Sequence, residues 1–144
     1  MSDAEHYRKL ERMYQAAPIN QFFEPRLTVS QGQAEVLIEV RPKFFHAAGA
    51  AHGAMYFKGL DDSAYFAVNS LVPDVFVLTI NFTTYIERPV SQGEIRCLGQ
   101  VVMASRNLFI AESRILDAKG REIARGSGHF VKGNTALSPE IGYA

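Results

Sequence analysis

The second half of the chain constrains the fold most, because it alternates apolar and polar residues in four consecutive runs. The runs occupy residues 75–87, 94–103, 108–116 and 122–131, and turn residues such as Gly93 and Gly120 separate them. This pattern is typical of an antiparallel meander, whose apolar face another element must cover. The meander therefore predicts a sheet packed against whatever helix the rest of the chain supplies.

One helical run, at residues 53–70, is the only element long enough to cover that sheet. In a helical projection its apolar side chains fall within an arc of about 120°. The arc contains Tyr56, Phe57, Leu60, Ala64, Ala67, Val68 and Leu71. The opposite side contains Lys58, Asp62 and Asn69, together with Met55 and Phe66. Two large apolar residues on a polar side indicate either a second packing surface, such as a subunit contact, or a loosely exposed Phe.

Three shorter elements precede this helix. Residues 3–17 predict a helix, since apolar residues recur every three or four positions after Asp3, which can cap it. Pro18 ends it, and alternating runs at residues 26–30 and 33–40 predict a hairpin. The complete order predicts an α+β fold in which an antiparallel sheet wraps one long central helix.

The length predicts a single domain. A chain of 144 residues buries roughly 70% of its unfolded surface on folding, and no repeat, linker or low-complexity tract divides it. We expect an N-terminal helical segment at residues 1–20, a core at 25–133 and a polar, loose tail at 134–144.

Charge and cysteine content exclude several classes of function. Fifteen basic residues cancel fifteen acidic ones, and Lys and Arg form no run of four, which argues against binding to nucleic acid or membrane surfaces. Cys97 stands alone, so no internal disulfide can form, and we expect a buried strand residue. No apolar stretch suggests a membrane span or a signal peptide, so we expect a cytoplasmic protein.

The stretch HAAGAAHGAMYFKGLDD, residues 46–62, contains the candidate chemistry. If a helix starts near His52, the backbone N–H groups of Gly53 and Ala54 are free at its positive end. Such groups can bind an oxygen that gains negative charge during a reaction, and small side chains let a ligand carbonyl reach them. Tight packing at the helix start explains Gly53 equally well, so both interpretations stay open.

Two adjacent acids follow on the same helix. Asp61 lies at the edge of the apolar arc, where desolvation can tune a base or nucleophile, whereas Asp62 is expected to be a solvated charge. Asp61 stands nine residues after His52, about 13 Å along the axis and half a turn round. The two cannot easily act on one bond within a chain, but a two-fold dimer with antiparallel helices brings each helix start to the partner's acid.

The remaining histidines and motifs indicate no metal or cofactor. His46 and His52 lack a third ligand at a fitting spacing, and His6 and His129 are far away in sequence. The chain also lacks a Gly-x-Ser-x-Gly elbow, a phosphate-binding loop and a dinucleotide fingerprint.

These residues resemble the hotdog-fold acyl-CoA thioesterases of the phenylacetate-pathway type. The pattern of that family is Asn-x-x-Gly-x-x-His-Gly-Gly, followed by an acid nine residues after the His. Here His46 replaces the Asn and Ala54 the last Gly, while Gly49, His52 and Gly53 match, with Asp61 as the acid. The segments LTINFTTYIERPV and REIARGSGHFVKG are also similar, so the resemblance covers roughly residues 25–133.

The resemblance implies a hotdog fold with a five- to six-stranded sheet, an acyl-CoA substrate and a homodimer or homotetramer with shared sites. Asp61 would be the nucleophile or the general base that activates water, and Thr79 would help to orient that water. The N–H of Gly53 would polarise the thioester carbonyl, with Ala54 as a candidate second donor, and His52 would hold the helix start. His46 would stand in for the amide that positions water or carbonyl in the family.

The phosphates of CoA need positive charge at the mouth of such a site, and arginine suits them because its guanidinium forks onto phosphate oxygens. Arg88 and Arg106 are at strand ends, with Lys132 as a third candidate, and each is equally compatible with a solvated turn charge. Because Asp62 stands next to Asp61, an ambiguity of one residue remains over which of the two is the acid of the pattern. Asp62 is also a candidate for contact with the substrate.

Two other functions stay open. A non-catalytic relative that only binds acyl-CoA stays open because His46 departs from the family pattern, whereas a hotdog acyl-thioester dehydratase would want a proline before the helix that this chain lacks. The acyl group, and the choice between CoA and acyl carrier protein, are not determined by the sequence.

Overall fold

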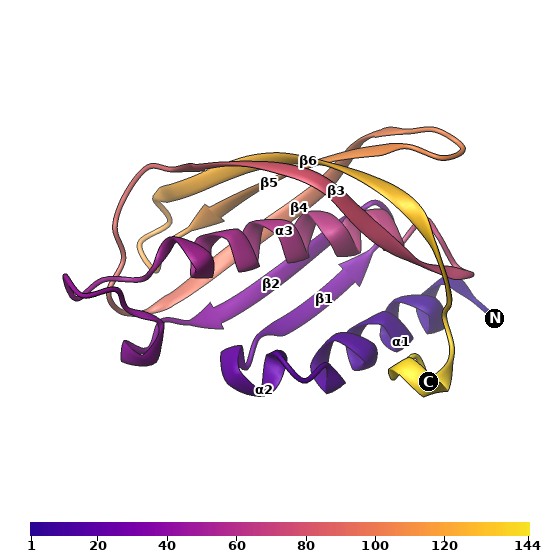
Figure 1. Cartoon of the computed structure of the whole chain (residues 1–144), viewed down its shortest axis with the longest axis horizontal. Helices are drawn as coiled ribbons and strands as arrows, with labels where there is room; N and C mark the ends of the chain where they lie inside the picture. Colours follow the sequence, from indigo (N-terminus) through magenta and orange to yellow (C-terminus); the bar gives the residue numbers. More distant parts are fainter.

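A computed structural model of the protein describes all 144 residues and confirms the predicted α+β arrangement (Figure 1). Six antiparallel strands form one sheet in the order β1-β2-β4-β5-β6-β3, and the long helix α3 lies along its inner face. In chain order the elements are α1 Asp3–Ala16, α2 Asn20–Phe23, β1 Arg26–Ser30, β2 Gln33–Glu39, η1 Pro42–Phe44, α3 Gly53–Asn69, β3 Val75–Ile86, β4 Glu94–Ala104, β5 Phe109–Leu116, β6 Glu122–Ala136 and η2 Pro139–Ile141. None of the helices is long and apolar enough to cross a membrane.

Helix α3 lies close to β4 because two glycines remove the side chains between them. A Cβ added to Gly59 of α3 would lie 2.4 Å from Sγ of Cys97, and one added to Gly99 of β4 would lie 2.1 Å from the carbonyl oxygen of Ser63. No side chain can be accommodated at such distances, so both positions require glycine. Cys97 is fully buried at this contact, as predicted. The close approach fixes the position of α3 on the sheet.

Helix α1 covers a side of α3 that the sheet leaves open. Ser2, one residue before the predicted cap, is its N-cap. On α3, Phe66 packs edge-to-face against Tyr14 of α1, with ring centroids 4.9 Å apart. Met55 and Phe66 are both buried within the chain, so this side is a packing surface, as predicted, but its partners belong to the same chain and not to a subunit. The alternative, a loosely exposed Phe66, is wrong. Phe57, predicted to be buried, is instead 44% exposed.

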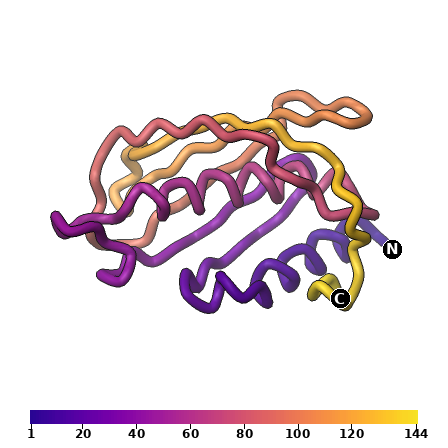
Figure 2. The backbone as a smooth tube through the Cα atoms, viewed as in Figure 1, coloured from indigo at the N-terminus to yellow at the C-terminus, as the bar shows by residue number.

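The residues after 133 do not form the loose tail that their polarity predicts. Strand β6 continues to Ala136, and the side chain of Tyr143 is buried in the core cluster that includes α1. The Tyr143 hydroxyl lies 2.7 Å from Nδ1 of His6, whose Nε2 lies 2.9 Å from the carbonyl oxygen of Asn69. A few apolar residues are thus enough to fix this segment, and both termini lie at one end of the molecule (Figure 2).

Strand β3 forms one edge of the sheet and contains a bulge that the sequence alternation does not reveal. Its register against β6 shifts between Thr79 and Asn81, so one extra residue stands on β3. Thr79 faces α3 before the bulge, and Phe82 packs against the core after it. Leu78 and Ile80 alternate in sequence with Phe82 and would share its face in a regular strand, but they are 48% and 58% exposed. The bulge thus turns Thr79 inward and leaves apolar side chains on the open edge.

Candidate active site

The start of α3 leaves one backbone donor free. His52 is the N-cap residue, and its Nδ1 accepts a hydrogen bond from the N–H of Ala54 at 2.9 Å. Ala54, predicted as a candidate second donor, is therefore already engaged. The N–H of Gly53 has no acceptor within the chain. A free donor at the positive end of a helix can bind an anion or a polarised carbonyl oxygen.

The loop before the helix explains the spacing of the two histidines. Gly49 adopts a φ of 83°, a conformation that glycine takes without steric cost. Nδ1 of His46 accepts a hydrogen bond from the N–H of Ala48 at 3.0 Å, which tightens the turn. The N–H of Ala51 then donates to the carbonyl oxygen of Val90 at 2.9 Å. The loop is thereby held against the segment that follows β3.

A cavity of about 330 Å³ opens at this helix start. It brings His46 and Gly53 together with Arg88, whose carbonyl oxygen accepts a hydrogen bond from the Tyr56 hydroxyl at 2.7 Å. A Cβ added to Gly53 would lie 3.3 Å from Cδ1 of Ile86, so the wall of the cavity is close at that point. The complete lining is His46, Ala51, Gly53, Tyr56, Ile86, Glu87, Arg88 and Pro89.

Asp61 lies farther along α3, where the helix faces β3. The hydroxyl of Thr79 donates a hydrogen bond to Oδ1 of Asp61 at 2.9 Å. Burial raises the pKa of Asp61 to about 6, with the nearby charge of Asp62 as the second cause, while the Thr79 hydrogen bond and the Lys58 charge lower it. A carboxylate with this pKa is mostly ionised at neutral pH and yet takes up a proton more readily than an ordinary aspartate. The arrangement suits a general base.

Asp62 is not the solvated helix charge that the projection predicts. Its side chain is 16% exposed, and Oδ2 accepts a hydrogen bond from the Tyr14 hydroxyl at 2.6 Å and pairs with Nζ of Lys58 at 2.6 Å. The projection fails here because it cannot include α1, which covers this side of α3. Asp62 is directed into the contact between α1 and α3, and it does not line the cavity at the helix start.

Within one chain the two groups of candidate residues stay apart. Gly53 and Asp61 are eight positions apart on α3, which corresponds to about 12 Å along the axis. The cavity that contains Gly53 includes neither Asp61 nor Thr79. The chain therefore presents a carbonyl-binding donor in one place and a base in another.

The three basic candidates for CoA binding are also dispersed. Arg88 lines the cavity at the helix start. Arg106 is exposed in the turn between β4 and β5, which extends at the upper right of Figure 1, whereas α3 begins at the left. Lys132 is exposed on β6 opposite Val77, and it does not line the cavity either. Only Arg88 is thus placed beside Gly53 by its own chain.

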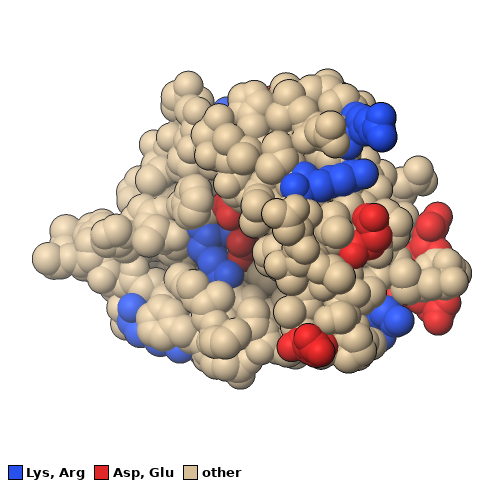
Figure 3. All heavy atoms as spheres, turned by 45° about the vertical axis from the view of Figure 1, so that its right-hand side comes forward, with Lys and Arg blue, Asp and Glu red and all other residues tan.

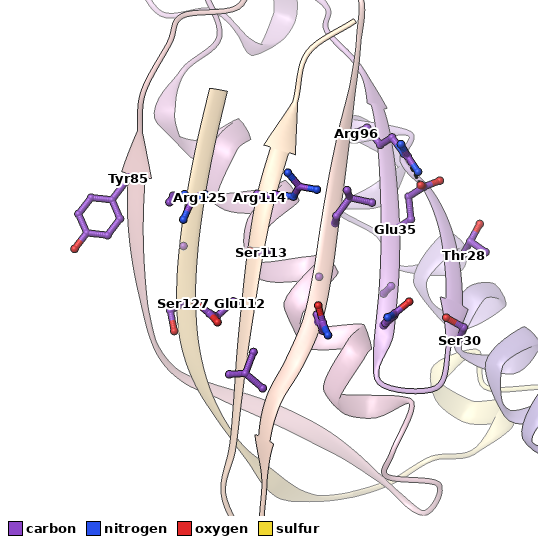
Figure 4. A pocket seen from close by; sticks show the side chains of 17 residues that line it. Thr28, Ser30, Glu35, Tyr85, Arg96, Glu112, Ser113, Arg114, Arg125 and Ser127 are labelled. Atoms are coloured by element: carbon purple, nitrogen blue, oxygen red, sulfur yellow. Dashed lines mark hydrogen bonds and ion pairs between the residues drawn. The ribbon is translucent and has the colours of Figure 1, made fainter. Parts of the chain in front are cut away.

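A larger hollow, of about 740 Å³, lies on the outer face of the sheet and contains none of the predicted site residues (Figure 4). Its ion pairs are open to solvent: Arg96 of the lining pairs with Glu35 at 2.6 Å, and Arg125 pairs with Glu122 at 2.7 Å. Exposed ion pairs of this kind contribute little energy and perturb no reactive group. The chemistry therefore points to α3 rather than to this face.

The sequence interpretation missed two neighbours of the acids, Lys58 and Tyr14. Lys58 stands four residues before Asp62 on the helix, and that spacing alone signals an ion pair. Nothing in the sequence signals Tyr14, because its contact depends on how α1 docks. No group of three or more His, Cys, Asp or Glu side chains lies close enough together to hold a metal ion.

The model of the thioesterase superfamily matches residues 48–124 of the chain. Among solved structures, the PaaI protein of the Escherichia coli phenylacetic acid degradation operon aligns with a TM-score of 0.85 at 15% identity, covering 94% of this chain and 99% of that one. A mutant of the phenylacetic acid degradation protein PaaI from Thermus thermophilus aligns with a TM-score of 0.74 at 20% identity, covering 81% and 100%.

A thioesterase from Haemophilus influenzae aligns with a TM-score of 0.78 at 12% identity, covering 85% of this chain and 87% of that one. No curated protein sequence matches the chain. At these identities the structural likeness shows the fold, and the predicted hotdog fold of the PaaI-like type is confirmed.

Proposed function

Because the chain belongs to the thioesterase superfamily, we propose that it hydrolyses an acyl-CoA thioester to a free acid and CoA. The observation that carries the proposal is Asp61, a largely buried carboxylate with a raised pKa and a hydroxyl partner. Strongly perturbed carboxylates of this kind cluster at catalytic sites. The free N–H of Gly53 supplies the second requirement of acyl transfer, a donor for the developing oxyanion.

In the proposed reaction the thioester carbonyl accepts a hydrogen bond from the Gly53 N–H. Asp61 takes a proton from water as the hydroxyl oxygen attacks the carbonyl carbon, or it attacks that carbon itself and water then releases the acid. In the first route the C–S bond then breaks, and protonated Asp61 gives its proton to the CoA thiolate. In the second the C–S bond breaks as the anhydride with Asp61 forms, and the water that hydrolyses this anhydride supplies the proton for the thiolate. Thr79 holds one carboxylate oxygen, so the other is available to the reacting atom.

His52 and His46 have supporting roles in this proposal. His52 fixes the first turn of α3 by capping Ala54, which aims the neighbouring Gly53 donor. His46 lines the same cavity and is a candidate to orient the carbonyl or the water. Arg88, at the mouth of that cavity, is the proposed anchor for a CoA phosphate, whereas Arg106 and Lys132 would reach a site only from a neighbouring copy.

We propose that two copies of the chain share each site, because Gly53 and Asp61 lie about two turns apart on one helix. The free edge of β3 supports this arrangement, since Leu78, Ile80, Tyr85 and Ile86 are exposed on or beside it. A two-fold pairing of this edge would bring the two α3 helices side by side in opposite directions. A homodimer, or a homotetramer built from two such dimers, would then have complete sites.

The test is a thiol-release assay with purified protein over acyl-CoA substrates of different chain length and aromatic character. We expect hydrolysis of at least one substrate, with a bell or sigmoid pH dependence whose acidic limb lies near the pKa of Asp61, about 6. Calorimetric binding of acyl-CoA without any turnover across the panel would contradict the proposal and identify a non-catalytic binding protein.

A further inference from the structure

The side of α3 opposite β3 contains a recessed ion pair that the proposed reaction does not use. Most charged side chains in Figure 3 stand out from the surface, but at one place basic and acidic atoms meet inside a hollow. Lys58 and Asp62 form a recessed pair, with side chains 10% and 16% exposed and 2.6 Å between Nζ and Oδ2. Such a pair is costly to bury, so its presence beside Asp61 calls for a reason.

The N-terminal helices enclose this pair. The Tyr14 hydroxyl of α1 donates to Oδ2 of Asp62 at 2.6 Å. Nζ of Lys58 lies 5.0 Å from the ring centroid of Tyr14 and 5.4 Å from that of Phe23 in α2. The faces of the two rings attract the ammonium group of Lys58 and keep water away from it. Burial raises the pKa of Asp62, while the charge of Lys58 and the hydrogen bonds from Lys58 and Tyr14 lower it, so the carboxylate depends on these partners to stay ionised. Their contacts also hold the carboxylate in a fixed place.

Few other charges act on Asp61. Tyr65 on α3, Tyr14 on α1 and Cys97 on β4 are the remaining titratable groups around the two acids, and burial raises the pKa of each. All three are therefore neutral at physiological pH. Thr79 on β3 is uncharged, so Asp62 and Lys58 are the charges that bear on Asp61.

We propose that Asp62 is a positioning residue for the reaction, which keeps Asp61 a competent base and which Lys58 and Tyr14 hold in its ionised form next to it. The proposal rests on the thioesterase function proposed above. It also gives α1 a part in catalysis, because Tyr14 belongs to that helix and touches Asp62.

The sign of the effect follows from the neighbouring charges. A negative charge next to a carboxylate disfavours its ionisation, so Asp62 raises the pKa of Asp61, while Lys58 lowers it. Without Asp62 the Asp61 carboxylate would lose its proton at lower pH and would be a weaker base for water.

The test is a titration of the aspartate carboxyl carbons by NMR on the full chain, which needs no substrate. Asp61→Asn assigns the signal of Asp61 by its disappearance. In Asp62→Asn, an isosteric change that keeps the Tyr14 hydrogen bond, we expect the midpoint of Asp61 to fall by about one pH unit. In the double variant Lys58→Met/Asp62→Asn the midpoint of Asp61 should fall less, because the lysine whose charge lowers the pKa of Asp61 is also removed.

A fourth variant tests the contribution of α1. Tyr14→Phe keeps the ring over Lys58 and removes one donor to ionised Asp62, so the midpoint of Asp62 should rise. An unchanged midpoint of Asp61 in Asp62→Asn would overturn the proposal, as would an unchanged midpoint of Asp62 in Tyr14→Phe.

The acidic limb of kcat/KM provides the catalytic readout. It should move to lower pH in Asp62→Asn in parallel with the NMR midpoint, which a loss of structural support alone would not cause. If Asp62→Asn leaves the limb in place while Asp61→Asn abolishes turnover, the thioesterase function stands and this inference fails. If Asp61→Asn remains active, the role proposed for Asp61 fails and this inference with it; if the wild-type chain hydrolyses no thioester, the proposed function itself fails, whatever the NMR titration shows.

Discussion

The two parts of the candidate site differ in how the fold provides their chemistry. At the start of α3 the useful group is a backbone N–H, in a cavity whose walls are short loops and the end of β3. Farther along the helix the useful group is a side chain, Asp61, which needs burial to become a good base. A free backbone donor requires a helix end that is open to a ligand, whereas a carboxylate with a raised pKa requires a buried position in the middle of the helix. One helix provides both, but two turns apart, which is why we propose that two copies of the chain share each site.

The largest expected effect follows from removing the side-chain part. Asp61→Asn keeps the shape of the side chain and the Thr79 contact but can neither take up a proton from water nor attack a carbonyl. We expect kcat to fall by roughly 10²-fold or more, measured by thiol release at saturating substrate. Asp62→Asn is the comparison variant: it keeps the reacting carboxylate of Asp61 and only makes it a weaker base, so it should lose far less activity above the acidic limb. The reverse pattern would identify Asp62 as the reacting acid.

The next effect tests whether the two parts belong to different copies. Gly53→Val places a branched side chain where a Cβ already lies 3.3 Å from Ile86, and it should block the carbonyl from the backbone donor. Mixed with Asp61→Asn chains, it should form hybrid dimers with one intact site. Random exchange then restores roughly one quarter of the wild-type activity.

The exchange itself must be verified by native mass spectrometry on chains of different isotopic mass. As the control for exchange, each variant is also mixed with wild-type chains that are labelled in the same way. If hybrids form and activity stays at the level of the separate variants, the site is not shared in this way, and the two parts must meet through a movement within one chain.

The third effect concerns stability and has the opposite sign to the effect on activity. The pKa of Asp61 is about 6 in the folded chain against an ordinary value of 3.8, so the folded state binds this proton more tightly than the unfolded state. The ionised carboxylate therefore destabilises the fold, by an amount that grows between these two pH values and is constant above them. Asp61→Asn removes this penalty and should raise the free energy of unfolding by about 1–3 kcal/mol near neutral pH.

Urea denaturation at a fixed protein concentration measures this difference, which should disappear as the pH approaches the ordinary value of 3.8. A gain that is equal at acidic and neutral pH would show that the amide is stabilising for reasons other than charge. A loss at neutral pH would mean that Asp61 supports the fold and that its pKa is not raised by burial.

Much of the fold could be predicted because local sequence patterns identify its main elements. Helix α3 and the four later strands have clear periodicities, and the small residues before the helix mark its start at Gly53. The strand β3 is different: Leu78, Ile80 and Phe82 alternate perfectly, so the pattern hides the bulge that places Ile80 outside. A bulge is a property of the pairing between strands, and a single strand does not record it.

The candidate site could be predicted to the same extent. The spacing of Gly53 and Asp61 on one helix is enough to suggest that they act in different copies. The burial of Asp62 could not be predicted, because it depends on the docking of α1 across α3. Contacts between elements far apart in sequence are decided by packing, which no local pattern contains.

The smallest expected effect concerns the anchor for CoA and sharpens the contrast between the open helix start and the rest of the surface. Arg88 lines the cavity beside Gly53, so Arg88→Ala should raise KM for an acyl-CoA several-fold and leave kcat nearly unchanged, because the lost phosphate contact is equal in ground and transition states. Arg106→Ala is the matched control, since Arg106 lies in the exposed turn between β4 and β5. The effect of Arg88→Ala should vanish with an acyl-pantetheine thioester, which lacks the nucleotide phosphates.

If Arg106→Ala raises KM as much as Arg88→Ala, the turn of a neighbouring copy reaches the nucleotide, and the CoA site extends across more than one chain. If Arg88→Ala weakens both substrates equally, Arg88 supports the loop that Tyr56 fixes through its carbonyl oxygen, and the phosphate anchor lies elsewhere.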